Sequence, residues 1–399
     1  MRVPSNYVYL DWAATTPLGE AAWRAMEPYL RPNSRTMEFD ANANSLHTPG
    51  RNAFAAFEDA RARIARSVGA QRPTEIVFTS GATEADNTAV LGIAAARARR
   101  EAQRGNADYV PHIVTSAIEH DAVLSLVPLM LSRGWSVDIL KPDHQGRISI
   151  EALQAAIKPE TAIVSIMWAN NEVGTVQDIA GLTRVTHEMG AVFHTDATQA
   201  VGKIPLDFAR SGVDAASFSS HKLCGPKGVG ALYLKTGTSC EPLLYGGGQE
   251  GGKRSGTQNV AGAVGFAAAC EHACRIAPDE RTRQSRLRDY LYRELCATGK
   301  VRASCSEAPK SESFLPNIVN VLVPGYESET LILQLDLAGF AVSGGSACSS
   351  GSLEPSHVLT ALGVPRDDAL CSMRVSLGMY TEEEDVRRFV EAFKGIVSK

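Results

Sequence analysis

The sequence predicts an α/β protein with a large domain on a mainly parallel central sheet and a smaller C-terminal α+β domain. Short apolar segments alternate with helical segments through the first two-thirds of the chain. This alternation is typical of a parallel sheet that helices cover on both faces. A glycine-rich stretch at residues 246–256 ends the pattern, and a long helical region follows it. The length of 399 residues leaves room for both domains.

Hydrophobic periodicity predicts the individual elements of the large domain. Apolar residues at helical spacing indicate helices at residues 51–68 and 83–99, and another helix begins near Asp121. Apolar runs predict strands at 75–79, 112–115, 137–140, 162–167, 191–195, 215–219 and 230–234. Helices at 150–157 and 179–189 fall between some of these strands. Ligands of such sheets bind beyond the carboxyl ends of the strands.

Two further helices are expected in the last third of the chain. The first runs from residue 260 to about 295 and leads into the smaller domain. The second begins at Thr381, where Glu384 three residues later completes a capping box. Its expected buried stripe consists of Val386, Phe389, Val390, Phe393 and Val397.

Charge and composition exclude several classes of function. The formal charge is −4 and no basic cluster is interleaved with aromatic residues, so we expect no nucleic-acid partner and no membrane. No apolar run is long enough for a secretory signal or a bilayer span, so a cytoplasmic location is expected. The eight cysteines are irregularly spaced, and they indicate neither a disulfide framework nor a metal site.

A glycine turn between a predicted strand and a predicted helix can hold a phosphate. It reads FTSGATE at residues 78–84. Backbone N–H groups at the helix start, together with the hydroxyls of Ser80 and Thr83, would be the donors. An ordinary strand-to-helix turn with a threonine at the N-cap explains the same residues.

A carboxylate and a lysine follow two later strands. Asp196 comes just after a strand, where it can keep a pyridine nitrogen protonated, although a helix N-cap is an equal alternative. Lys222 lies between His221 and a turn that contains glycine and proline, with Lys227 close by. Neighbouring cations keep such an amine free for a Schiff base. A phosphate turn, a ring carboxylate and a Schiff-base lysine, each following a strand, indicate a pyridoxal-phosphate (PLP) site.

With these motifs in view, the chain resembles the cysteine desulfurases, in the class V branch of the fold-type I PLP enzymes. The likeness extends nearly to the C-terminus. It rests on LDWAATTP at 10–17, TSGATE at 79–84, EHDAV at 119–123, NNEVG at 170–174, DATQ at 196–199, SSHK at 219–222, RSGT at 254–257, GSACS at 345–349 and MRVSL at 373–377.

The resemblance implies a role for each residue that would touch the cofactor ring. Lys222 would hold PLP as a Schiff base and move the Cα proton of the substrate. Asp196 would pair with the pyridine nitrogen and Gln199 with the phenolic oxygen. His120 would stack on the ring and act as acid and base, for which an imidazole is suited. Without the family, an ordinary core histidine would be the better explanation of His120.

The resemblance also implies how the phosphate and the substrate are held. The phosphate would be bound by Ala82, Thr83, Ser219 and His221, and by Thr257 from the other subunit of a homodimer. Arg374 would bind the substrate carboxylate, with help from Asn171, which also belongs to the cofactor site, and Asn42. Taken without the family, Arg374 would be read as a surface arginine.

Cys348 is the residue that would select among PLP reactions. It lies in a serine- and glycine-rich stretch at residues 343–352, which cannot pack a core and should be mobile. The alternative is a flexible surface loop with an incidental thiol. The resemblance implies that L-cysteine gives L-alanine and a persulfide on Cys348. An acceptor protein, expected to be an iron–sulfur assembly scaffold, would then take the sulfur.

The expected large domain spans residues 19–271. The expected small domain comprises residues 1–18 and 272–399 and carries the mobile cysteine loop at about 341–355. The chain departs from the family pattern at Asn42-Ala43-Asn44, at Gly344, and at Cys224, which adds a second thiol near Lys222. Two rival functions remain open: another PLP reaction in which Cys348 is dispensable, and a binding protein that has kept the fold.

Overall fold

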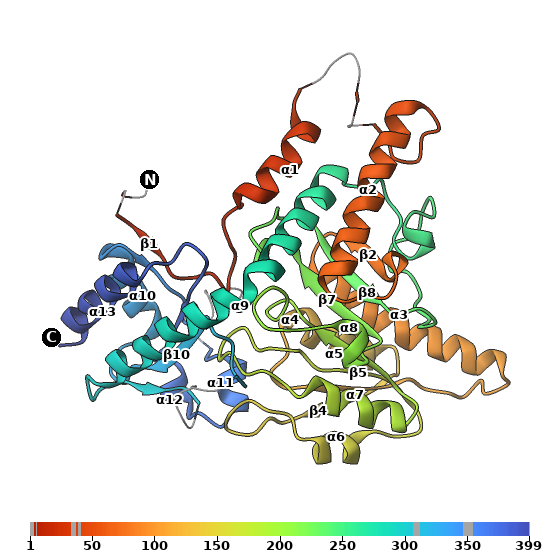
Figure 1. Ribbon diagram of the computed structural model, residues 1–399. Helices are drawn as coiled ribbons and strands as arrows, with labels where there is room; N and C mark the ends of the chain where they lie inside the picture. The colour runs from red at the N-terminus through yellow and green to blue at the C-terminus, as the bar shows by residue number, and fades with distance from the viewer. Residues whose placement is uncertain are drawn as a thin grey trace.

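The structure is a computed structural model that describes residues 4, 6–32, 37–38, 41–305, 312–345 and 354–398. Figure 1 shows a larger part built on a central sheet and a smaller part that holds the C-terminus. Among the described residues, no helix combines the length and the apolar character needed to cross a bilayer.

A seven-stranded sheet forms the centre of the larger part. Its strand order is β2-β8-β7-β6-β5-β3-β4. All strands run parallel except β8, which is antiparallel to both of its neighbours. The prediction of a mainly parallel sheet is therefore confirmed. The strands are β2 (Ile76–Thr79), β3 (His112–Ser116), β4 (Ser136–Leu140), β5 (Thr161–Ser165), β6 (Val192–Asp196), β7 (Ala215–Ser219) and β8 (Gly230–Leu234).

Helices accompany this sheet, as the alternating pattern predicted. They are α1 (Glu20–Leu30), α2 (Thr48–Ser67), α3 (Ala82–Gln103), α4 (Asp121–Leu124), α5 (Val127–Ser132), α6 (Ile150–Ala156), α7 (Ile179–Glu188), α8 (Phe208–Ser211) and α9 (Val260–Cys296). Short 3₁₀ turns occur at η1 (Pro73–Glu75), η2 (Ser220–Lys222) and η3 (Glu250–Gly252).

The smaller part is α+β, as predicted. Its antiparallel sheet has the order β12-β10-β9, and β1 pairs in parallel with β11 from far along the chain. The strands are β1 (Val8–Tyr9), β9 (Arg302–Ala303), β10 (Ile318–Leu322), β11 (Phe340–Ala341) and β12 (Ser372–Ser376). The helices are α10 (Ser328–Leu337), α11 (His357–Ala361), α12 (Arg366–Ala369) and α13 (Glu383–Val397).

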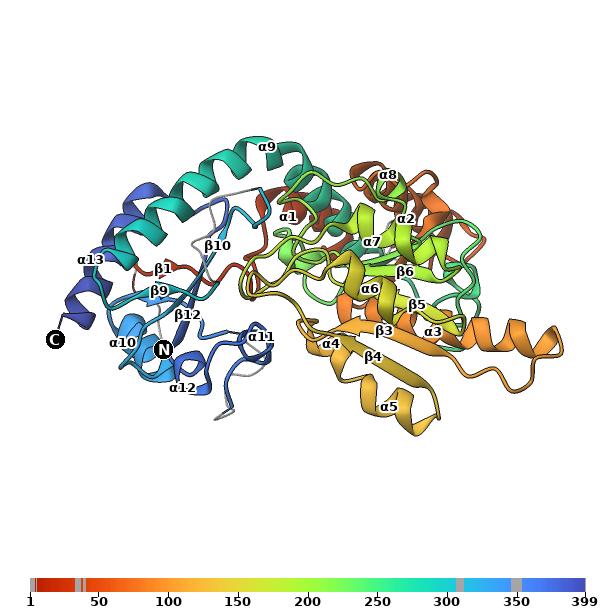
Figure 2. The same ribbon diagram turned by 90° about the horizontal axis from the view of Figure 1, so that it is seen from below.

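Helix α9 connects the two parts, as Figure 2 shows from below. Its first half, up to Ala273, belongs to the hydrophobic core of the large sheet. Its second half, from Leu287, belongs to a separate core with β10, β12 and α13. These two cores are the basis for proposing a domain boundary inside α9, between Ala273 and Leu287 and close to the expected 271–272.

The start of the last helix differs from the prediction. The capping box is formed by Glu382 and Asp385, one residue later than the predicted pair of Thr381 and Glu384. The reason is that the Thr381 hydroxyl accepts a hydrogen bond from the backbone N–H of Gly378 at 3.0 Å and is not available as a cap. The five predicted apolar residues of this helix are all buried.

Candidate active site

A cavity of about 460 Å³ opens at the carboxyl ends of the parallel strands. Segments that follow β2, β3, β5, β6 and β7 form its walls, and Arg374 reaches it from the small sheet. The cavity thus brings together most of the predicted site residues. Those in its walls are Ala82, Thr83, His120, Asn171, Asp196, Gln199, Ser219, His221, Lys222 and Arg374.

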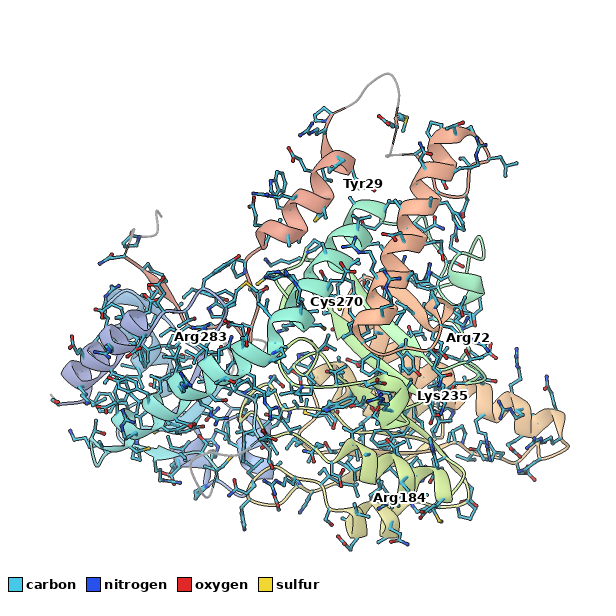
Figure 3. The ribbon with its side chains drawn as sticks, viewed as in Figure 1. Tyr29, Arg72, Arg184, Lys235, Cys270 and Arg283 are labelled. Atoms are coloured by element: carbon cyan, nitrogen blue, oxygen red, sulfur yellow. The ribbon has the colours of Figure 1, made fainter. Side chains whose placement is uncertain are left out.

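A larger cavity of about 600 Å³ lies elsewhere, between α9 and the segment that leads into α8. Figure 3 labels Cys270 and Arg283 on this helix. Cys274 and Arg281 from α9 line the cavity, but none of the predicted site residues does. Volume alone therefore does not identify the site. The smaller cavity is the candidate because the titratable groups gather there.

Lys222 ends the short turn η2 that follows β7. Its Nζ donates to the backbone carbonyls of Ala13 and Ala14, at 2.6 and 2.7 Å. The next turn is tight, because a Cβ on Gly225 would lie 2.0 Å from the Ser220 hydroxyl oxygen. Glycine at this position therefore lets the chain turn directly behind the lysine and hold its amine in the cavity wall.

The helix start after β2 is an open anion site. The N-cap of α3 is Gly81, and no side chain caps the helix. The alternative with a threonine at the N-cap is therefore wrong. A Cβ on Gly81 would meet only the Ser219 hydroxyl, at 4.0 Å, whereas a Cβ on Gly230 would lie 2.7 Å from Gly81. Strand β8 can approach this turn only with glycine there, and the N–H groups of α3 are left to face the cavity.

His221 directly precedes Lys222 and lines the same cavity. Its Nδ1 lies 3.0 Å from the Thr15 hydroxyl. Burial, followed by the charges of Lys222 and Lys227, lowers the pKa of His221 to about 4. The imidazole is therefore neutral at pH 7, and it can hydrogen-bond a phosphate without adding a further positive charge.

Asp196 is the last residue of β6 and its side chain is almost fully buried. Its Oδ1 accepts from the backbone N–H of Thr198 at 2.8 Å. The residues after it form turns and not a helix, so the helix N-cap alternative does not apply. This carboxylate lies in the cavity wall, where the nitrogen of a bound pyridine ring can meet it.

A second carboxyl group, Asp86 on α3, also lines the cavity and was missed by sequence reasoning. It is 1% exposed, and neither of its oxygens has a hydrogen-bond partner of normal geometry among the described residues. Burial and then the charge of Asp196 raise the pKa of Asp86 well above its usual range. Burial therefore favours the protonated, neutral form of Asp86.

The environment of Asp86 agrees with this neutral state. His194 Nε2 lies 3.6 Å from Asp86 Oδ1, and burial lowers the pKa of His194 to about 3. The neutral imidazole is held by the hydroxyls of Ser165 and Ser217, each at 2.9 Å. Among the residues that the structure describes, no cation therefore compensates a charge on Asp86.

His120 caps the short helix α4, which begins at Asp121 as predicted. Its Nδ1 accepts from the backbone N–H of Ala122 at 3.1 Å. A neutral His120 ring therefore carries its proton on Nε2. The cap fixes the plane of the ring at the cavity wall, which suits both stacking on a cofactor and proton transfer.

Gln199 follows Asp196 in the turn after β6 and is 4% exposed. Its Nε2 donates to the carbonyl of Ala13 at 3.0 Å. The same carbonyl accepts from Lys222. One backbone oxygen therefore holds the two side chains that would act on the cofactor ring from this side of the cavity.

Arg374 lies in the middle of β12 and is 1% exposed. Its Nη1 donates to the backbone carbonyl of Asn171 at 3.0 Å, and its Nη2 forms an ion pair with Asp11 at 2.8 Å. Its buried Nε has no partner among the described residues. The side chain nevertheless borders the cavity, and a planar guanidinium there is suited to bind a carboxylate. Arg374 is thus a buried side chain and not the surface arginine that residue-level reasoning favours.

Three predicted site residues are not placed in this cavity. Asn42 and Thr257 are exposed and do not line it. Their segments nevertheless touch, since Gln258 Nε2 donates to Asn44 Oδ1 at 3.1 Å. Cys348 lies outside the residues that the structure describes.

The described side chains fit PLP as a bound group. The uncapped start of α3 and the Ser219 hydroxyl match a phosphate, and the Asp196 carboxylate matches a ring nitrogen. Lys222 supplies the amine for covalent attachment. The cavity therefore provides a partner for each charged part of this cofactor.

Comparisons with known proteins agree with this site. The family model described as aminotransferase class-V matches residues 8–389. The cysteine desulfurase IscS of Dictyoglomus turgidum is 42% identical over 392 residues, which cover 98% of this chain and 95% of that protein. The cysteine desulfurase NifS of Azotobacter vinelandii is 39% identical over 392 residues, 98% of this chain and 93% of that protein.

Solved structures give the same result. A NifS-like protein superposes with a TM-score of 0.87 at 36% identity, covering 98% of this chain and 99% of that one. SspA in complex with cysteine superposes with a TM-score of 0.77 at 32% identity, covering 94% of this chain and 100% of that one. The chain therefore belongs to the aminotransferase class-V family and, within it, to the cysteine desulfurases.

Proposed function

We propose that this protein is a PLP-dependent cysteine desulfurase that converts L-cysteine to L-alanine and carries the released sulfur as a persulfide on Cys348. The observation that carries the proposal is that Lys222, Asp196, the open start of α3 and Arg374 meet in one cavity. The relatives named as cysteine desulfurases support it, as does the related SspA, which was solved with cysteine.

Each described residue has a defined task in this reaction. Bound PLP supplies an electron sink that stabilises negative charge at the substrate Cα. Asp196 holds a proton on the ring nitrogen, Lys222 removes the Cα proton, and Arg374 orients the substrate carboxylate. His120, whose neutral ring carries a proton on Nε2, acts as acid and base beside the ring.

Sulfur transfer requires a thiolate as well as the cavity. The Cys348 thiolate attacks the substrate sulfur, so that an S–S bond forms while the bond between sulfur and Cβ breaks. The electron pair remains on the substrate carbon, which takes up a proton and leaves as alanine. The persulfide then passes to a thiol of an acceptor protein by a second attack at sulfur.

The experiment that tests the proposal compares two thiols. Cys348→Ser should lower alanine and persulfide production by orders of magnitude, because a serine hydroxyl cannot form a persulfide. Its cofactor absorbance should stay normal, since Lys222 and Asp196 are untouched. Cys224→Ser is the matched control, because burial raises the pKa of that thiol and disfavours its thiolate.

Normal alanine production in Cys348→Ser would refute the desulfurase proposal and favour another PLP reaction. A loss of activity confined to Cys224→Ser would move the nucleophile to Cys224. Lys222→Ala serves as the inactive reference, because it should lose both covalent attachment of the cofactor and all turnover.

We also propose a homodimer whose active sites are composite. The support is that Asn42 and Thr257 lie outside their own cavity, on neighbouring exposed segments joined by the contact between Gln258 and Asn44. Both segments could therefore enter the cavity of a partner subunit together.

Subunit mixing tests this arrangement. A heterodimer of Lys222→Ala and Thr257→Ala chains would contain one site with native Lys222 and native Thr257 if the site is shared between chains. Activity should then exceed that of either parent and approach half of the wild-type value. If each site lies within one chain, mixing two impaired parents would give no gain, and the composite site would be disproved.

The sulfur acceptor, expected to be an iron–sulfur scaffold, and the cytoplasmic location remain predictions.

A further inference from the structure

Lys203 is a half-buried lysine to which the proposed reaction has not yet given a role. It ends the turn that follows β6 and Asp196. Its Nζ donates to Gln199 Oε1 at 2.9 Å. It also lines a small cavity of about 60 Å³ together with Lys222 and Cys224. Lys203 therefore stands directly behind the wall of the cofactor cavity.

The hydrogen bond from Lys203 helps to fix how the Gln199 amide is oriented. An ammonium group only donates, so the amide must present its oxygen to Lys203 and its Nε2 to the other side. There Nε2 donates one N–H to the Ala13 carbonyl at 3.0 Å. Its second N–H can meet the phenolic oxygen of a cofactor. Without Lys203, the Ala13 carbonyl alone would hold the amide in this orientation.

The same contacts link Lys203 to Lys222. The Ala13 carbonyl that accepts from Gln199 also accepts from Lys222 Nζ at 2.6 Å. A cation at one end of this chain polarises the amide, and a polarised N–H donates more strongly to an anionic oxygen. Lys203 is therefore linked to Gln199 by a direct hydrogen bond, and to Lys222 through the Gln199 amide and the Ala13 carbonyl.

The charge of Lys203 also acts on Lys222 directly. Burial, followed by the charge of Lys222, lowers the pKa of Lys203 to about 7. Because electrostatic coupling between two sites is mutual, a charged Lys203 disfavours a proton on the nitrogen of Lys222. The other titratable groups around Lys203 are Asp196 from β6, His221 and Cys224 near Lys222, and Glu280 and Arg281 from α9.

We propose that Lys203 is a positioning residue for the cofactor: it orients the Gln199 amide toward the phenolic oxygen and places a positive charge against the nitrogen of Lys222. This inference rests on the proposed roles of Lys222 and Gln199. In this role, Lys203 influences whether the Lys222 nitrogen carries a proton. A merely structural lysine would have no such influence.

The test is a pH titration of the cofactor absorbance band in the purified holoenzyme. Lys203→Met removes both the donor and the charge, and each loss favours a proton on the Lys222 nitrogen. The midpoint should rise by about one pH unit. Lys203→Arg keeps the charge at every pH and should hold the midpoint at or below the wild-type value. Lys203→Gln keeps a neutral donor, so its midpoint should lie between those of Lys203→Met and Lys203→Arg.

The matched control is Lys235→Met. Lys235 directly follows β8, and the end of β8 pairs with the start of β7. Lys222 follows the end of β7, so the two lysines lie at opposite ends of these strands. Figure 3 labels Lys235 in the large domain, away from α9. Its Nζ pairs with Asp214 at 3.6 Å. Its replacement should leave the absorbance midpoint at the wild-type value.

A second measurement needs no cofactor. In the apo-protein, acylation of Lys222 by an amine reagent, followed by peptide mass spectrometry across pH, should show the same rise in Lys203→Met. Identical midpoints in wild type, Lys203→Met and Lys203→Gln would overturn the inference. The proposed function would fail separately, if borohydride did not fix the cofactor to Lys222 in the wild type.

Discussion

The two ends of the active-site cavity hold their charges in different ways. At the cofactor end, side chains stand on turns after parallel strands, and Lys222 is set against the neutral carbonyls of Ala13 and Ala14. At the substrate end, Arg374 lies inside an antiparallel strand and is neutralised by Asp11. The first end offers unpaired donors to an anion, whereas the second is already ion-paired.

This difference shows what each ligand must displace. A phosphate that arrives at the uncapped start of α3 displaces no side chain. A substrate carboxylate at Arg374 must share the guanidinium with Asp11. The N-terminal segment contributes to both ends, because Asp11 and Ala13 are two residues apart. Movement of this segment would therefore couple substrate binding to the position of Lys222.

The largest expected effect concerns the two carboxyl groups at the cofactor end. Asp196→Asn removes the charge that keeps the ring nitrogen protonated, so alanine production should fall by about 10²- to 10³-fold. Asp86→Asn should cost only a few-fold, because an amide replaces an acid whose proton is already retained by burial and by the charge of Asp196. Steady-state rates and holoenzyme spectra of both variants measure the contrast.

Equal losses in these two variants would contradict the neutral state of Asp86. A larger loss in Asp86→Asn would transfer the role of ring partner from Asp196 to Asp86. Cofactor content, measured after gel filtration, separates a lost ring contact from a lost fold.

A smaller effect is expected at the substrate end. Arg374→Met removes charged hydrogen bonds to the substrate carboxylate, so KM for L-cysteine should rise about 10- to 100-fold. Cofactor affinity should change by less than a few-fold, because Arg374 contacts the cofactor side only through the backbone carbonyl of Asn171. Arg374→Lys keeps the charge without the planar fork and should give an intermediate KM. If cofactor affinity fell as far as substrate affinity, the cavity would not be divided into two ends.

The cofactor end was largely predictable from the sequence, and the physical reason is its topology. Parallel strands bring the residues that follow them to one edge, so Asp196, Lys222 and the turn at residues 78–84 could be assigned to one site. Arg374 could not be found in this way. It lies in the middle of a strand, and only the family resemblance identified it.

Other site features depend on packing that no local pattern records. Asp86 occupies an ordinary helix position, and only burial beside Asp196 gives it a neutral side chain. Lys203 acquires its proposed role through one hydrogen bond to the Gln199 amide. The carbonyl of Ala13 carries no side-chain signal at all. Contacts between segments some 200 residues apart, such as that between Ala13 and Lys222, can be read only from the folded chain.

The smallest expected effect comes from Asp11→Asn, and its sign differs between two measurements. Asp11 balances the charge of the buried Arg374 in the free protein, so its neutralisation should lower the free energy of unfolding by about 1–2 kcal/mol. The same change removes a carboxylate that repels the substrate carboxylate, so KM for L-cysteine should fall a few-fold. Thermal unfolding and steady-state kinetics of one preparation test both parts. A variant that loses stability and also binds L-cysteine more weakly would show that Asp11 holds Arg374 in its binding position and does not compete with the substrate.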